Sequence, residues 1–152
     1  MADDVVWEDL NAFRMSEADA WRTIDAAPGC VVTWTRRDGQ SIGVWVTHAV
    51  LDGALWLTTT AGRPKTVAWL RDPRMSAAFG VPGIGSVTVL GRIALREDRA
   101  MQRRFLVAIR DRLQIPAEAR ESWMEHMDSD GRLVGPVAVD RLITFDERKL
   151  QY

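Results

Sequence analysis

The residues best suited to bind an anion gather in one stretch of the chain, residues 55–74. Residues 55–60 are rich in aromatic and β-branched types, which predicts a strand. Residues 61–64 contain glycine and proline and predict a turn, and residues 65–71 have the apolar spacing of a short helix. Asp72-Pro73 predicts the end of that helix, because a residue before proline avoids the α region.

Thr58, Thr59, Thr60, Arg63 and Lys65 fall around this predicted turn. A helix N-terminus carries unpaired backbone N–H groups and a partial positive charge. Hydroxyl donors, a guanidinium and an ammonium placed beside it would favour an anion, most simply a phosphate. The alternative is a threonine-rich strand end with solvated basic residues. The stretch therefore predicts a candidate phosphate cradle.

The composition is that of a soluble globular protein, with 47% hydrophobic and 27% charged residues. We expect one domain over residues 1–152, with an N-terminal helical segment (1–27) and a helical insertion (98–128). The net charge of −1 gives no bulk attraction to nucleic acid or to an anionic membrane surface. The chain also contains only two lysines, Lys65 and Lys149, so the lysine in the predicted cradle is unusual.

Cellular location is predicted from three absences in the sequence. No apolar run approaches the length of a membrane span. The acidic start Met-Ala-Asp-Asp lacks the apolar segment of a signal peptide. The single Cys30 excludes an internal disulfide and a multi-cysteine metal site. We therefore expect a protein of the reducing cytoplasm.

Turn signals divide the chain into short strands with helices between them. Asp38-Gly39 and Asp52-Gly53 predict tight hairpin turns, and Gly91 in mid-strand predicts a bulge. Strands are predicted over residues 30–35, 41–50, 55–60, 75–81, 86–96, 133–139 and 142–145. Helices are predicted over 7–27, where Ser16 is the expected N-cap of the later part, over 98–116, where Asp98 is the expected N-cap, and over 117–127. The fold class is mostly β: an antiparallel barrel of about six strands with peripheral helices.

This order of elements resembles the pyridoxamine-phosphate oxidase-like, FMN-binding split barrel family. The segments that carry the resemblance are Thr-Thr-Thr-Ala-Gly-Arg-Pro-Lys (58–65), Leu-Arg-Asp-Pro-Arg (70–74) and Val-Thr-Val-Leu-Gly-Arg-Ile-Ala-Leu (87–95). The closing segment from Asp140 to Lys149 is also similar. The family includes deazaflavin-dependent reductases as well as FMN proteins.

The resemblance implies a homodimer with a cofactor in each of two grooves between the subunits. Arg63 and Lys65 would hold the cofactor phosphate, and Thr59 and Thr60 would add hydroxyl or backbone contacts. The second predicted strand would lie along the flavin ring, bonding it through the backbone around Val46 and Thr47. Trp45 beside them would line the ring pocket or pack in the core.

Two departures from the vitamin B6 oxidases argue against a true pyridoxamine-phosphate oxidase. Those enzymes carry a basic residue directly before the loop lysine, where this chain has Pro64 and Arg63 is displaced by one position. They also carry basic residues on the second strand where this chain has Val44 and Ala49. The Arg-Pro-Lys form is more similar to the deazaflavin-using branch, so both FMN and the deazaflavin coenzyme F-420 remain open.

Other catalytic and metal sites have little support in the sequence. His48 could contact a substrate near the ring, or it could be structural, as a lone histidine on a strand usually is. His48 and His126, without a carboxylate or cysteine pattern, do not predict a metal site. No nucleophile elbow, dinucleotide-binding or Walker glycine motif is present. No side chain is predicted to act as a catalytic acid or base.

Three functional hypotheses follow from these observations. The leading one is a flavin-type oxidoreductase that uses FMN and passes hydride to or from a small organic substrate. The second is an F-420-dependent reductase on the same barrel. The third is a non-catalytic flavin- or haem-binding protein, for which only His48 and His126 could supply an axial ligand.

Overall fold

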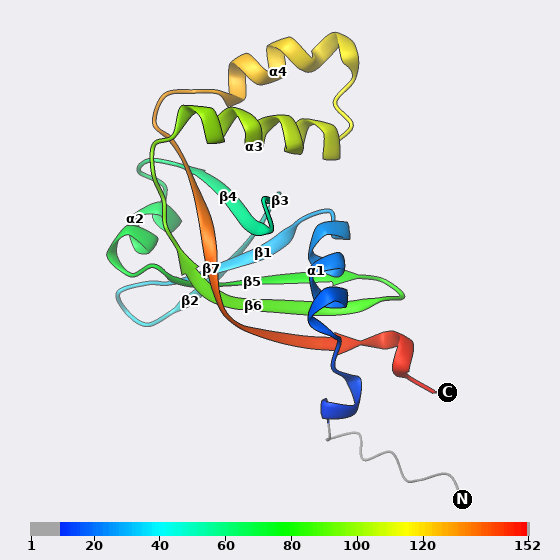
Figure 1. Cartoon of the computed structure of the whole chain (residues 1–152). Helices are drawn as coiled ribbons and strands as arrows, with labels where there is room; N and C mark the ends of the chain where they lie inside the picture. The colour runs from blue at the N-terminus through cyan, green and yellow to red at the C-terminus, as the bar shows by residue number, and fades with distance from the viewer. Residues whose placement is uncertain (1–9, 152) are drawn as a thin grey trace, which may run out of the picture.

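Seven antiparallel strands form a single curled sheet in the computed structural model, which describes residues 10–151 (Figure 1). The order across the sheet is β2-β1-β5-β6-β7-β4-β3. The strands are β1 (Cys30–Thr35), β2 (Ser41–Val46), β3 (Ala49–Leu51), β4 (Ala54–Thr60), β5 (Arg74–Val81), β6 (Gly85–Ile93) and β7 (Arg132–Asp146). This confirms the predicted mostly-β split barrel, with seven strands in place of about six.

The predicted strand 41–50 is in fact two strands, β2 and β3. β2 pairs with β1 at one end of the sheet, whereas β3 pairs with β4 at the other end. Thr47 and His48 connect the two strands. Because these two consecutive strands have different partners, the short connection links the two ends of the curled sheet.

The last two predicted strands are one continuous strand, β7, which pairs with β4 over residues 132–137 and with β6 over residues 137–146. The β6–β7 register shifts between Leu90 and Gly91, so Asp140 is an extra residue on β7. A Cβ atom on Gly91 would collide with the carbonyl oxygen of Ala138. The predicted bulge at Gly91 is therefore present, and it bends the sheet there.

The N-terminal helix α1 (Glu17–Ala26) begins where the sequence places its cap. Ser16 Oγ accepts a hydrogen bond from the Asp19 backbone N–H at 3.1 Å. The expected helix over 7–27 is otherwise too long, because residues 10–13 form a separate 3-10 turn, η1 (Leu10–Phe13). The expectation for residues 7–9 lies outside the described residues. α1 packs against β5 and β6 and buries Ile24.

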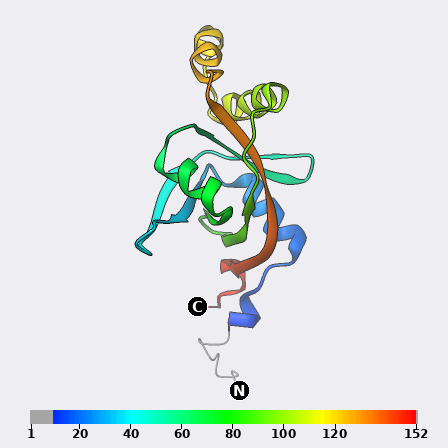
Figure 2. The same cartoon turned by 90° about the vertical axis from the view of Figure 1, so that its left-hand side faces the viewer.

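Two further groups of helices lie at different places around the sheet (Figures 1 and 2). Helix α2 (Pro64–Arg71) connects β4 to β5. Between β6 and β7 lie α3 (Arg99–Arg112), the short turn η2 (Ala117–Ala119) and α4 (Arg120–Met127). Asp98 caps α3 as predicted, accepting from Met101 N–H at 3.0 Å. The turn η3 (Glu147–Lys149) closes the chain.

The apolar interior consists of two clusters. The larger lies between the concave side of the sheet and α1 and includes Ile24, Leu55, Phe79 and Val87. The smaller lies under α3, where Phe105, Leu106 and Ile109 pack on Trp56 and Val134. The helical segment between β6 and β7 thus has its own buried contact with β4 and β7.

The convex side of the sheet carries an exposed row of residues from five strands. The strand registers align Trp45, Val31, Ala78, Thr88 and Ile143 across β2, β1, β5, β6 and β7. Trp45 is 60% exposed and Ile143 49% exposed, which is high for large apolar side chains in a sheet. We call this set the outer row.

Among residues 10–151, no helix has the length and apolar character needed to span a membrane.

Candidate functional site

Buried hydroxyl bonds fix the start of α2 to the end of β4. Thr66, in the first turn of α2, donates from Oγ1 to the carbonyl oxygen of Thr60 at 2.8 Å. Its hydroxyl also shares a 2.8 Å hydrogen bond with that of Thr59. Arg63 is the N-cap, and Pro64 occupies the first helical position, where its fixed φ suits a helix start. These bonds determine where the side chains of the loop point.

The three consecutive threonines do not share one environment. Alternation along β4 puts Thr58 and Thr60 on one face of the strand and Thr59 on the other. Thr59 is only 3% exposed, and its hydroxyl is bonded to Thr66. The hydroxyl of Thr60 instead accepts from Arg63 Nε at 2.7 Å. A role for the Thr59 hydroxyl in phosphate binding therefore does not fit this placement, whereas one for Thr60 does.

Three cationic side chains surround this end of β4: Arg63, Lys65 and Arg132, which we call the basic cluster. Arg132 begins β7 and lies directly opposite Thr60 in the β4–β7 register. Its Nε donates to the carbonyl oxygen of Met127 at 2.5 Å, and its Nη1 lies 3.5 Å from Thr58 Oγ1. Arg63 and Arg132 thus contact hydroxyls two residues apart on the same face of β4.

The charges of the basic cluster are not neutralised by an ion pair. No carboxylate among residues 10–151 lies within 4.0 Å of the charged nitrogens of Arg63, Lys65 or Arg132. Partial burial lowers the pKa of Lys65 below its ordinary value, and the positive charges of Arg63 and Arg132 lower it further. The site holds like charges together, which is unfavourable unless an anion binds among them.

The pKa of Arg132 responds to the same surroundings. Burial lowers the pKa of Arg132, the charge of Arg63 adds to this, and the carboxylate of Asp128 acts in the opposite direction. Asp128 itself is held by Arg99 at 3.7 Å and by Arg103 at 3.0 Å. Two other arginines therefore already compensate the carboxylate of Asp128.

Sequence reasoning missed Arg132. It is 67 positions beyond Lys65, and only the pairing of β7 with β4 places it at the cluster. The sequence signal was weak: one arginine between Gly131 and the start of the predicted strand 133–139. The register of that strand was needed to give the arginine a role.

The residues predicted to line the flavin ring lie in a different part of the sheet. Trp45 and Val46 end β2, and Thr47 starts the connection to β3. The Trp45 ring lies over Gly29, where an added Cβ would come within 2.6 Å of the ring carbon Cζ2. Within the described residues, no hydrogen bond or ion pair joins these three residues to the basic cluster. Trp45 is exposed in the outer row and is not a core residue.

The placement of His48 corrects its predicted contact with a substrate. The side chain is completely buried, edge-on to the Phe79 ring at 4.8 Å between ring centroids. Its Nε2 lies 2.6 Å from the carbonyl oxygen of Ile24, and its Nδ1 has no hydrogen-bond partner. Burial is the main cause that lowers the pKa of His48 to about 4. His48 is therefore a neutral core residue at physiological pH.

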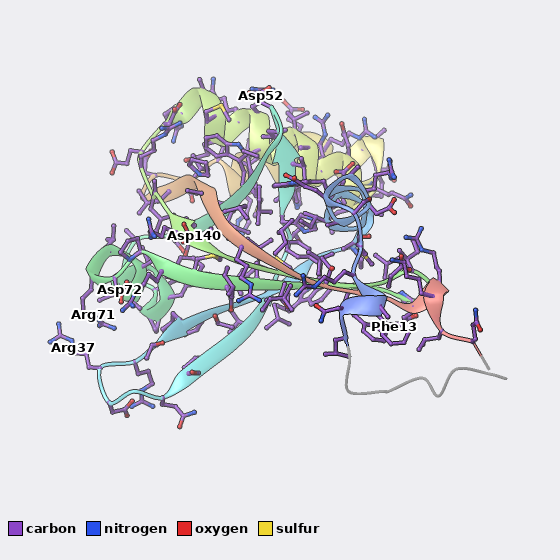
Figure 3. The ribbon with its side chains drawn as sticks, turned by 60° about the horizontal axis from the view of Figure 1, so that its bottom comes forward. Phe13, Arg37, Asp52, Arg71, Asp72 and Asp140 are labelled. Atoms are coloured by element: carbon purple, nitrogen blue, oxygen red, sulfur yellow. The ribbon has the colours of Figure 1, made fainter. Side chains whose placement is uncertain are left out.

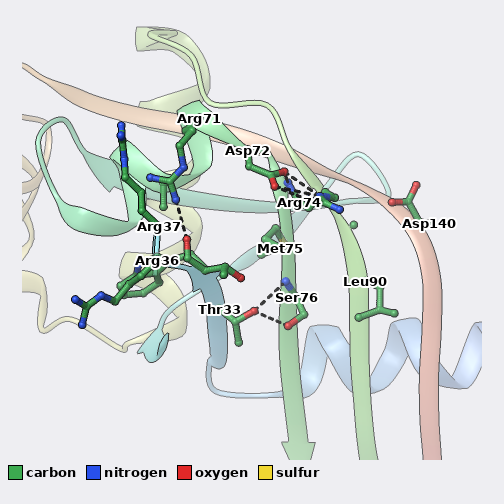
Figure 4. A pocket seen from close by; sticks show the side chains of 14 residues that line it. Thr33, Arg36, Arg37, Arg71, Asp72, Arg74, Met75, Ser76, Leu90 and Asp140 are labelled. Carbon is green, nitrogen blue, oxygen red and sulfur yellow. Dashed lines mark hydrogen bonds and ion pairs between the residues drawn. The ribbon is translucent and has the colours of Figure 1, made fainter. Parts of the chain in front are cut away.

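A hollow of about 750 Å³ lies on the convex side of the sheet, beside the end of α2 (Figure 4). Its charged side chains come from the β1–β2 hairpin, from the α2–β5 segment and from β7: Arg36, Arg37, Arg71, Asp72, Arg74 and Asp140. Figure 3 places Arg37, Arg71 and Asp72 together on one side of the molecule, away from Asp52. None of the three cluster residues lines this hollow.

The charges of this hollow are largely paired, unlike those of the basic cluster. Arg74 binds both carboxylate oxygens of Asp72, and this holds the pKa of Asp72 at about 2. Arg36 pairs with Asp38 at 3.1 Å, and Arg71 donates to the carbonyl oxygen of Thr35 at 2.8 Å. The two basic regions therefore differ: the hollow contains Asp72 and Asp140 beside its arginines, whereas no carboxylate within the described residues pairs with a member of the basic cluster.

No group of three or more metal-ligating side chains (His, Cys, Asp or Glu) occurs among the described residues. Cys30 is fully buried, and burial raises the pKa of its thiol to about 12. A thiol in this state is protonated and unreactive at neutral pH.

Comparison with solved structures identifies the fold. A conserved hypothetical protein from Mycobacterium tuberculosis superposes with a TM-score of 0.79 at 24% identity, over 93% of this chain and 92% of that one. A structure described as an F420 reductase gives 0.61 at 19% identity, over 85% of this chain and 98% of that one. A protein of the pyridoxinephosphate oxidase family from Clostridium acetobutylicum, related to general stress protein 26, superposes with a TM-score of 0.63 at 11% identity. The match covers 88% of this chain and 92% of that one.

This chain has the pyridoxamine-phosphate oxidase-like split-barrel fold. The resemblance stated from the sequence is thereby confirmed at the level of the fold. No family model matches the sequence. No curated protein matches it either. The likeness therefore shows the fold, and the ligand and the reaction depend on the residues of this split barrel.

Proposed function

We propose that this split barrel is a flavin-type oxidoreductase whose basic cluster binds the phosphorylated tail of the coenzyme. The observation that carries the proposal is the group of three cations, Arg63, Lys65 and Arg132, without an ion-pair partner among the described residues. Three neighbouring cations, of which Lys65 and Arg132 are partly buried, raise the free energy of the ligand-free protein when no anion is bound. A phosphate bound among them would relieve their repulsion and accept charge-assisted hydrogen bonds.

Each residue of the site has a role in this proposal. Arg63 is held by the Thr60 hydroxyl at 2.7 Å, so its guanidinium is oriented before the ligand arrives. Lys65 supplies a compact charge from the first turn of α2, whose N-terminal backbone amides also favour an anion. Trp45 and the backbone of Val46 and Thr47 would lie against the flavin ring. A bound flavin supplies the hydride chemistry, while the protein orients it and excludes water.

A second copy of the chain is part of the proposal. The basic cluster is not enclosed by any of the larger hollows of the single chain, and Trp45 is 60% exposed. The outer row offers Trp45, Val31 and Ile143 as an exposed apolar strip. Association of two outer rows would bury the strip and place residues of the partner over the coenzyme ring, as expected for a homodimer.

FMN is the proposed coenzyme, and the deazaflavin F-420 is the alternative. Both carry a phosphate that the basic cluster could bind. The likeness to a structure described as an F420 reductase supports the alternative as much as the likeness to the pyridoxinephosphate oxidase family supports FMN. Non-catalytic haem binding has less support, because His48 is buried with Nε2 bonded and His126 lies on the exposed helix α4.

The direct experiment is to identify the small molecule that co-purifies with the protein. Absorption spectroscopy and mass spectrometry of the denatured supernatant would follow purification without added cofactor. A yellow protein that releases FMN supports the proposal. A colourless protein that gains thermal stability from F-420 but not from FMN supports the alternative. Haem in the supernatant, or the absence of stabilisation by either coenzyme, would contradict the proposal.

A further inference from the structure

Arg132 differs from the other two members of the basic cluster in its origin. Arg63 and Lys65 belong to the loop that connects β4 to α2, whereas Arg132 follows the helical segment α3–α4 and starts β7. The backbone of Ala61 donates to the carbonyl oxygen of Gly131 at 2.8 Å, which ties this turn to the β4–α2 loop. Two segments far apart in sequence thus meet at one point with three positive charges.

The Arg132 guanidinium is fixed through one nitrogen and open at the others. Nε donates to the Met127 carbonyl oxygen at 2.5 Å, which is a strong structural bond to the end of α4. The other two contacts are weak: Nη1 to Thr58 Oγ1 at 3.5 Å, and Nη2 to Met127 Sδ at 4.0 Å. A guanidinium carries five N–H donors, so most of this one's capacity remains for a ligand. The tether through Nε pre-orients the open edge.

The number of cations at the site then determines how well it distinguishes ligand tails that carry one negative charge from those that carry two. Two cations, Arg63 and Lys65, are enough to bind a tail with one negative charge. Each cation attracts a bound anion in proportion to the anion's charge, so a third cation beside them strengthens the binding of a doubly charged tail more than that of a singly charged one. A phosphate monoester carries close to two negative charges above pH 7, because its second pKa is about 6.

We propose that Arg132 is the specificity-determining residue of the cradle, which makes it a site for coenzyme tails with at least two negative charges. This inference rests on the proposed function, since it names the ligand class of the same site. It includes phosphate monoesters such as FMN and tails with a phosphate and further carboxylates. It disfavours uncharged and singly charged tails.

The test uses three flavins with the same ring and different tail charges at pH 8 and low salt. Riboflavin is uncharged, riboflavin 4′,5′-cyclic phosphate carries one negative charge, and FMN carries two. Dissociation constants from flavin fluorescence would be measured for the wild type, Arg132→Gln and Arg104→Gln. Arg104 is the matched control, because it is an arginine of α3 that pairs with Asp52 and lies outside the cluster.

The expected result is a loss of selectivity in one variant only. The wild type should prefer FMN over the cyclic phosphate by about ten-fold or more, the scale of one charge-assisted hydrogen bond. Arg132→Gln should remove most of this ratio, because it should weaken FMN more than the cyclic phosphate and leave riboflavin affinity within about two-fold. Arg104→Gln should keep the wild-type ratio. A purely structural role for Arg132 would weaken all three ligands together and would overturn the inference.

Other outcomes separate this inference from the proposed function. If Arg132→Gln keeps the FMN preference while Lys65→Ala weakens FMN, the inference is wrong and the phosphate site stands. If the wild type binds FMN and the cyclic phosphate equally, the charge argument is wrong. If none of the flavins binds and no deazaflavin does, both proposals fall.

Discussion

At the scale of single residues, position in the strand decides what a side chain can do. Thr58, Thr59 and Thr60 are identical in type, yet only Thr59 is turned into the interior. His48 is polar and adjacent to the strand predicted to contact flavin, yet it is completely buried. Residue type alone suggested a role in ligand binding for all four residues. Burial argues against such a role for the side chains of Thr59 and His48.

His48 makes stability depend on pH in the acidic range. Its pKa is lowered to about 4 in the folded protein, from 6.5, mainly by burial. The charge of Arg112 also lowers it, whereas the Ile24 carbonyl and Asp25 act to raise it. Since the folded pKa is depressed, the stabilising contribution is complete above pH 6.5 and is lost as the pH falls towards 4. The loss for this group approaches about 3 kcal/mol.

Urea denaturation between pH 7.5 and 4.5 would measure this dependence. The wild type should lose unfolding free energy below pH 6.5, and His48→Asn should flatten that part of the curve, whatever its stability at pH 7.5. His126→Gln, which removes the exposed histidine of α4, should keep the wild-type slope. An unchanged slope in His48→Asn would show that other groups cause the effect.

At the scale of elements, local signals predicted more than the strand pairings did. The caps Ser16 and Asp98, the turn at Gly62 and the bulge at Gly91 were all readable, because each depends on a few neighbouring residues. The split of residues 41–50 into β2 and β3 was not, since it depends on pairing with different strands. Arg132 was missed for the same reason: its place is set by the β4–β7 register.

The junction between β4 and α2 supports the whole candidate site. Thr66→Val keeps the shape of the side chain but removes the hydroxyl that bonds the Thr60 carbonyl and the Thr59 hydroxyl, both at 2.8 Å. Losing a buried polar partner costs about 1–3 kcal/mol of unfolding free energy, which urea denaturation would detect. Thr35→Val, at an exposed position on β1, is the matched control and should cost much less. Equal stability of both variants would mean that the hydroxyl bonds do not anchor α2.

At the scale of the whole molecule, the outer row exposes large apolar side chains to solvent, which is unfavourable for a single chain in water. Ile143 and Trp45 are 49% and 60% exposed on the convex side of the sheet. Such exposed apolar side chains on one face are typical of an interaction surface. The homodimer in the proposed function would cover them with a second copy.

Light scattering coupled to size-exclusion chromatography would test the homodimer. The wild type should elute as a dimer, and Ile143→Arg should shift the population to the monomer, because the charge would be buried at the interface. Leu113→Arg is the matched control: Leu113 is 47% exposed but lies at the end of α3, so the dimer should persist. A wild type that remains monomeric at high micromolar concentration would contradict the dimer.

The central claim is that the basic cluster binds the phosphate of a flavin-type coenzyme, and one calorimetric comparison tests it most directly. FMN and riboflavin would be titrated into the wild type and into Lys65→Ala, with Lys149→Ala as the control for the loss of a lysine. We predict that Lys65→Ala weakens FMN binding by about 1.5–3 kcal/mol, the scale of a charge-assisted hydrogen bond, and leaves riboflavin binding unchanged. Equal FMN affinity in the wild type and Lys65→Ala would contradict the claim.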